Sequence, residues 1–120
     1  MTTAKLNPHL SPTKRLAVRF SIMTGETVMN TARILNVAIS TIFTLTKHLP
    51  KPASRMPNFG QEAERSLRQL TMQELGIASP EASALIWPAM MTEALALLRT
   101  SKQAHQKFQA SNLKIEEASA

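Results

Sequence analysis

Residues 27–49 read TVMNTARILNVAISTIFTLTKHL, and this stretch decides the fold of the chain. Val28, Thr31 and Leu35 recur at helical spacing, which predicts the buried face of a first helix. Asn36 follows that helix, and after Gly it is the residue that best accepts a left-handed turn conformation. The stretch therefore predicts a helix, a tight turn and a second helix.

The second helix is expected to bury one face and to expose the other. Val37 should point inward from the turn, Ile42 and Leu45 continue the apolar face, and Pro50 stops the helix. The exposed face is dominated by short hydroxyl and basic side chains, which enter a DNA major groove without steric conflict. The candidate base-facing residues are Ile39, Ser40, Thr41, Thr44 and Lys47.

The segment NVAISTIF, from Asn36 to Phe43, is similar to the recognition-helix segment of the resolvase and invertase recombinases. The longer stretch resembles the helix-turn-helix of bacterial and phage DNA-binding proteins. Where that family often carries a basic residue, this chain has Ile39. The resemblance covers nothing of a recombinase catalytic domain, so it implies a DNA-binding mode and no recombination chemistry. An ordinary helical hairpin with a Thr-rich exposed face is the alternative interpretation.

Composition favours a helical protein without redox or disulfide chemistry. Hydrophobic residues make up 43% of the 120 residues, but aromatic residues only 4%, and there are three Gly, which favours helices over sheets. The absence of Cys excludes disulfides, thiolate catalysis and zinc ribbons, and it is compatible with a reducing cytoplasm. The N-terminus shows no signal-peptide pattern, and polar residues interrupt the apolar stretch at 28–45. We therefore expect a cytoplasmic protein without a membrane partner.

The positive charge is concentrated in the N-terminal half. The net charge is +6, with eight basic residues and one acidic residue in positions 1–55, against six basic and seven acidic residues in positions 56–120. An excess of positive charge around the two central helices is expected for a polyanion partner, and a merely soluble basic surface is the alternative. The candidate phosphate contacts are Lys14, Arg15, Thr27, Arg33, Lys51 and Arg55.

A further helix is predicted to precede the central pair. Residues 1–10 are expected to form a flexible arm, after which Ser11 caps and Pro12 begins a helix that ends near Met23 and is closed by Gly25. Its predicted inward residues are Leu16, Phe20 and Met23, and its predicted outward residues are Lys14, Arg15 and Arg19. Residues 11–49 would then form a tri-helical DNA-binding unit.

The C-terminal half is expected to hold two or three helices, so that the fold class is all-α. A Pro-rich linker is predicted over 50–59, followed by a helix over 61–75 that Gly76 ends. In this helix Glu64 and Arg68 are spaced for an ion pair.

A last helix is predicted to start at Ser79-Pro80, and Pro88 either kinks it or ends it near Ile86. Its apolar residues cover more than one face, which favours a second partner outside the chain. We therefore interpret 60–110 as an oligomerisation or interaction region and 111–120 as a frayed tail. The candidate oligomerisation residues are Leu85, Trp87, Met91, Leu95 and Leu98.

The sequence offers no pattern for catalysis, for a metal or for a cofactor. Its three His residues are too far apart to show a ligand spacing, and the chain has no Asp and no Gly-rich phosphate loop. Glu62 and Glu64 fall on different helix faces, which argues against a catalytic carboxylate pair. We expect no enzyme.

These observations predict a sequence-specific protein that binds double-stranded DNA, most simply a small dimeric transcriptional regulator of bacterial or phage type. One alternative is a DNA-packaging or replication-accessory subunit in a higher homo-oligomer. Another is a helical adaptor or inhibitor that binds protein instead of DNA.

Overall fold

The computed structural model describes residues 10–47, 49 and 60–119, and the fold is all-α, as predicted. Within these residues there is no strand, and two helices follow the linker. The helices are α1 (Pro12–Met23), α2 (Val28–Leu35), α3 (Ile39–Thr46), α4 (Gln61–Leu75) and α5 (Pro80–Ser119).

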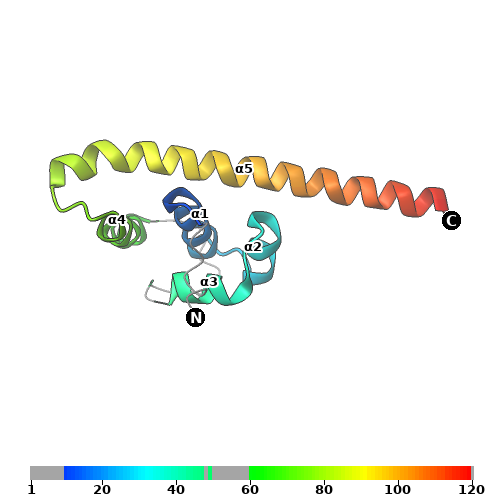
Figure 1. Cartoon of the computed structure of the whole chain (residues 1–120), viewed down its shortest axis with the longest axis horizontal. Coiled ribbons are helices and arrows are strands. Elements are labelled where there is room, and N and C mark those ends of the chain that lie inside the picture. Colours follow the sequence, from blue (N-terminus) through cyan, green and yellow to red (C-terminus); the bar gives the residue numbers. More distant parts are fainter. Residues whose placement is uncertain (1–9, 48, 50–59, 120) are drawn as a thin grey trace.

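Helix α1 is the centre of the fold, because it contacts each of the other four helices. Figure 1 shows α1 between α5 on one side and α3 on the other. The molecule is 59 Å long. That length matches the 40 residues of α5 at about 1.5 Å per residue, and α5 continues past α2 toward the C-terminus (Figure 1).

The ends of α1 follow the predicted capping pattern. The Ser11 hydroxyl accepts a hydrogen bond from the Lys14 amide at 3.1 Å, and Pro12 occupies the first helical position. After the helix, Gly25 adopts a φ of 102°, which lets the chain reverse toward α2. Both ends of α1 could therefore be predicted from the residues next to them in the sequence.

Two predictions about the surface of this first unit are wrong. Arg19 was expected to face solvent, but only 4% of it is exposed. Its burial is tolerated because its guanidinium donates to groups on α3 and α4. Leu10 was assigned to the flexible arm, but it is 6% exposed and belongs to the core. The rest of the predicted arm and the predicted linker lie outside the described residues.

The core joins α1 to both halves of the chain. Leu16, Ile42 and Leu67 are among its fully buried residues and come from α1, α3 and α4. Val37 is also buried, as expected for the residue that follows the turn. The other buried apolar residues are Leu10, Ala17, Val18, Met23, Leu35, Leu49, Met72, Trp87, Met90, Ala94 and Leu98.

The predictions for α4 and α5 are confirmed in part. Gly76 ends α4 with a φ of 74°, as predicted. Glu64, expected to pair with Arg68, accepts a hydrogen bond from the Trp87 indole nitrogen at 3.1 Å.

Helix α5 continues through Pro88, so the alternative in which a helix ends near Ile86 is wrong. Pro88 has no amide proton and therefore cannot donate the usual helical hydrogen bond to the Ala84 carbonyl. Both residues are exposed, so water can donate to that carbonyl instead. Residues 111–119 of the predicted frayed tail belong to α5, which runs to Ser119.

Candidate nucleic-acid interface

The turn between α2 and α3 is built by local hydrogen bonds and one left-handed residue. Thr27 caps α2 by accepting from the Asn30 amide at 3.1 Å. Asn36 ends α2 at φ 56° and ψ 55°, and the Val37 amide donates back to the Ala32 carbonyl at 3.1 Å. The chain bends by 113° between the two helices. Asn36 therefore sets the direction in which α3 leaves α2.

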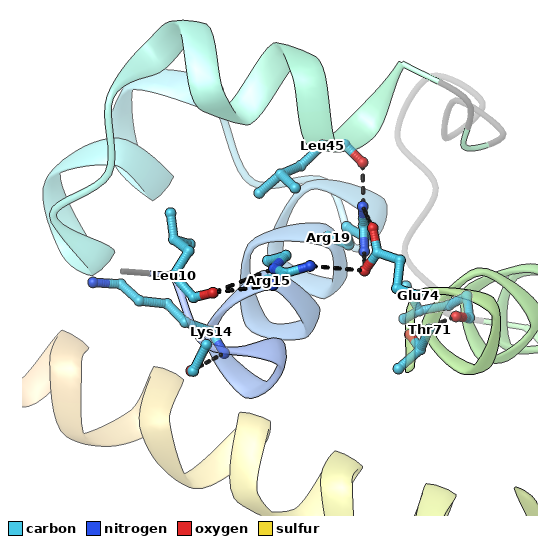
Figure 2. A network of polar contacts seen from close by, with 9 residues as sticks. Leu10, Lys14, Arg15, Arg19, Leu45, Thr71 and Glu74 are labelled. Carbon is cyan, nitrogen blue, oxygen red and sulfur yellow. Dashed lines mark hydrogen bonds and ion pairs between the residues drawn. The ribbon is translucent and has the colours of Figure 1, made fainter. Parts of the chain in front are cut away.

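Polar contacts from α1 fix both helices of this pair. The hydroxyls of Ser21 on α1 and Thr31 on α2 share a buried hydrogen bond of 2.8 Å. Arg19 Nε donates to the Leu45 carbonyl near the end of α3 at 2.8 Å. Figure 2 shows this bond, with the same guanidinium reaching Glu74 on α4. The orientation of α3 is therefore set by α1 and not by the turn alone.

The ion pair that completes this contact is short and two-pronged. Arg19 Nη1 and Nη2 lie 2.7 and 2.6 Å from the two carboxylate oxygens of Glu74. The hydrogen bonds from Arg19 hold the pKa of Glu74 below its ordinary value of 4.5; burial opposes this, and the charges of Arg19 and Arg15 add to it. In the described part of the chain, every buried side-chain nitrogen and oxygen has a hydrogen-bond partner.

The outer face of α3 contains most of the predicted base-facing residues. Ser40, Thr44 and Lys47 are exposed, Ile39 is 42% exposed, and Thr41 is half-buried. The Thr44 hydroxyl donates to the Ser40 carbonyl at 3.1 Å. The structure therefore brings these side chains to one accessible helix, on the side of α1 opposite α5 (Figure 1).

Sequence reasoning missed Phe43 as a candidate site residue. Phe43 is 59% exposed, although it is one of the largest side chains of α3. The signal was present in the sequence, because Phe43 lies four residues after Ile39 and outside the face that Ile42 and Leu45 define. Met29 on α2 is a further large apolar residue exposed in this unit, at 52%.

The predicted phosphate contacts differ in how free their side chains are. Arg33 is exposed on the last turn of α2, Lys14 is half-buried on α1, and Thr27 is exposed at the α2 cap. Arg15 is engaged within the chain, because its Nε and Nη2 donate to the Leu10 carbonyl at 3.3 Å and its Nη1 lies 3.7 Å from Glu74. Lys51 and Arg55 lie outside the described residues.

The candidate oligomerisation residues separate into two groups. Leu85 is 79% exposed, Leu95 is 36% exposed, and Met91 is half-buried. Trp87 and Leu98 are 5% and 7% exposed and pack in the core of the single chain. The expectation that these two residues contact a second copy is therefore corrected, since α5 uses them to cover its own protomer.

The described residues show no arrangement that would hold a metal, because no three His or Glu side chains come together there. A cavity of about 700 Å³ lies between α4 and the start of α5, and Arg68 is the charged residue among the described ones that line it. The residues that line this cavity do not point to a particular reaction.

No single helix in the described ranges is long and apolar enough to cross a membrane; α2 and α3 reach that length and hydropathy only together, across their 113° bend. Comparison of the chain with protein families, with curated proteins and with solved structures finds no match.

Proposed function

We propose that the protein binds double-stranded DNA in a sequence-specific manner, as a small dimeric transcriptional regulator of bacterial or phage type in the cytoplasm. The proposal rests on one observation: α3 leaves α2 at a bend of 113°, lies on the side of α1 opposite α5, and exposes Ser40, Thr44 and Lys47 beside Ile39 and Phe43. Two helices at about 90–120° joined by a short turn are the geometry of DNA-binding helix-turn-helix units. In this role α3 enters the major groove, and α1 supports it from behind.

Charge supports a polyanion as the partner of this face. Residues 27–47 include Arg33 and Lys47 and contain no Asp or Glu. Neither α2 nor α3 therefore carries an acidic side chain that would repel a phosphate backbone; the carboxylate of Glu26, just before α2, accepts a hydrogen bond from the Asn30 side chain at 3.2 Å. Ala38 caps α3 without a side-chain hydrogen bond, which leaves the first amides of α3 open to a phosphate oxygen.

The side chains then take two kinds of role. Ile39, Ser40 and Thr44 would face base edges, together with Thr41 and Lys47 at the margins of the contact. The phosphate contacts would come from Lys14, Thr27, Arg33, Lys51 and Arg55, with Arg15 in a secondary place because its donors are already engaged.

The experiment measures the affinity of the purified full chain for fluorescent duplex DNA over a series of salt concentrations. We expect the logarithm of the association constant to fall linearly with the logarithm of the salt concentration. Thr44→Glu should abolish binding, because it places a carboxylate where α3 approaches the DNA.

Thr100→Glu is the matched control. Thr100 is exposed on α5 and donates its hydroxyl to the carbonyl four residues earlier, as Thr44 does. Both substitutions add one negative charge and remove one hydroxyl. The proposal fails if wild type shows no salt-dependent binding, or if both variants bind equally well.

One observation favours a second function, that of a helical protein-binding adaptor. Met29, Ile39 and Phe43 are exposed apolar residues on α2 and α3, and such residues are enriched at protein interfaces. This function predicts a salt-insensitive complex with a protein and no binding of duplex DNA. The DNA-packaging alternative differs from the regulator in oligomeric state, which sedimentation measures.

A further inference from the structure

The exposed face of α3 contains two large apolar side chains that the fold does not bury. Ile39 is 42% exposed and Phe43 is 59% exposed, and they lie four residues apart, on one side of the helix. Ile42 on the same helix is fully buried. Helix α3 therefore has separate apolar surfaces, one toward α1 and one toward solvent.

Lys47 is the one base-facing residue of this face whose side-chain type makes paired hydrogen bonds to a purine. Residues 39–46 read ISTIFTLT and contain no Arg, Asn, Gln, Asp or Glu. Those residue types, together with Lys, make the directed contacts to guanine, adenine and cytosine in the major groove, so that within 39–46 the large side chains are apolar. The proton of the Thr44 hydroxyl is already donated to the Ser40 carbonyl, so Thr44 can contact a base through its methyl group or as an acceptor, but not as a donor.

Apolar side chains have one matching group on the major-groove edge of DNA. Of the four bases, only thymine presents a methyl group there, and Phe and the Thr methyl are among the contacts that recognise it. We propose that Ile39, Phe43 and the Thr44 methyl read the 5-methyl groups of thymine, so that the preferred sites of the protein are rich in A·T pairs. This inference rests on the proposed function and specifies its substrate.

A protein partner is the other occupant that an apolar face could take, and the charge pattern favours DNA. The apolar pair lies on a segment whose charged residues, Arg33 and Lys47, are both basic. The positive charge of Arg19, a buried basic residue behind α3, is already neutralised by the Glu74 carboxylate. The exposed charges on α2 and α3 are therefore complementary to phosphate.

The experiment begins with selection of bound duplexes from a randomised pool by the full chain. The enriched duplex is then made again with deoxyuridine in place of each thymidine in turn. Uracil keeps the base pair and removes only the methyl group. We expect about a three- to fivefold loss of affinity at each thymine that α3 contacts, the size expected for one buried methyl group.

The variant Phe43→Ala completes a cycle between protein and DNA. It should bind the thymine duplex more weakly than wild type does. It should also bind the thymine and uracil duplexes equally when the uracil replaces the thymine that Phe43 contacts. Met29→Ala is the matched control, because Met29 is exposed to a similar degree on α2. It should keep the full preference for thymine. Circular dichroism of both variants checks that the helices are intact.

Each contrary result has a distinct meaning. If wild type binds thymine and uracil duplexes equally at every position, the inference is overturned while DNA binding stands. If Phe43→Ala and Ile39→Ala both keep the full preference, other residues read the methyl group and the inference is again overturned. If Phe43→Ala instead dissociates an oligomer without changing DNA affinity, the face binds protein. If wild type binds no duplex, the proposed function itself fails.

Discussion

Arg19 on α1 holds Glu74 on α4 through two hydrogen bonds, Nη1 to Oε1 at 2.7 Å and Nη2 to Oε2 at 2.6 Å (Figure 2). The third donor of the same guanidinium, Nε, reaches the Leu45 carbonyl on α3. One buried side chain therefore connects the helix proposed to read DNA with the C-terminal half. Loosening this contact should affect the position of α3 as well as the stability of the fold.

The first prediction concerns the energy of this ion pair. Glu74→Leu leaves a guanidinium that is 4% exposed without its carboxylate, so we expect it to cost about 3 kcal/mol of unfolding free energy. The double variant Arg19→Met with Glu74→Leu should cost less than Glu74→Leu alone, because the buried charge is then gone. Urea denaturation of Arg19→Met, Glu74→Leu and the double variant measures the three unfolding free energies. Simply additive costs would show that the two residues are not coupled.

The second prediction concerns pH. Folding lowers the pKa of Glu74, chiefly through the hydrogen bonds from Arg19, so its contribution is complete above the ordinary pKa of 4.5. That contribution is lost as the pH falls below 4.5 through the lower pKa of the folded state. We expect the unfolding free energy of wild type to fall more steeply with acidification in this range than that of Glu74→Gln. Equal slopes for the two proteins would contradict the assignment.

The third prediction concerns the turn. Asn36 has a φ of 56°, which L-residues with branched side chains adopt only at a cost. Asn36→Gly should change the unfolding free energy little, whereas Asn36→Val should lower it by about 1–2 kcal/mol. Thermal unfolding followed by circular dichroism compares the three proteins. A Val variant as stable as wild type would mean that the turn relaxes to another conformation.

The features that could be predicted from sequence are those fixed by neighbours in the chain. Ser11 as a cap, Asn36 as the left-handed residue and Gly76 as a terminator all depend on residues within one helical turn. The contact between Arg19 and Glu74 spans 55 residues, and an Arg on the first helix has the same local pattern whether it is buried or exposed. Its burial could not be predicted from that pattern.

The candidate interface was predictable to a similar degree. The spacing of Ser40 and Thr44 placed them on the exposed face of α3, where the structure has them. The two-sided apolar pattern of α5 was also visible, but the pattern alone could not say which side meets α1. The structure answers this, since Trp87 and Leu98 face inward and Leu85 faces solvent.

The fourth prediction distinguishes a basic residue that contacts phosphate from one that stabilises the fold. Arg33 is exposed, so Arg33→Gln should weaken binding to all DNA sequences and lower the salt slope by about one. Arg15→Gln is the comparison variant, because the Arg15 guanidinium bonds the Leu10 carbonyl. It should lower the unfolding free energy and leave the salt slope nearly unchanged. Binding isotherms over a salt series decide between the roles, and equal changes in slope would show that Arg15 also meets phosphate.

The last prediction concerns self-association through α5. Leu85 and Leu95 are the large apolar residues exposed on α5 among the side chains that the structure describes there, 80–107, so Leu85→Lys with Leu95→Lys should leave the unfolding free energy within about 0.5 kcal/mol per site. The double variant should sediment as a monomer and bind DNA orders of magnitude more weakly, since a dimer contacts two half-sites. Leu98→Lys is the contrasting variant, because Leu98 is buried in the core. It should lose several kcal/mol of stability, about the cost of burying an unpaired charge. Sedimentation of wild type as a monomer at micromolar concentration would contradict the dimer. The exposed side of α5 would then face solvent or a different protein, and α3 would read one half-site alone.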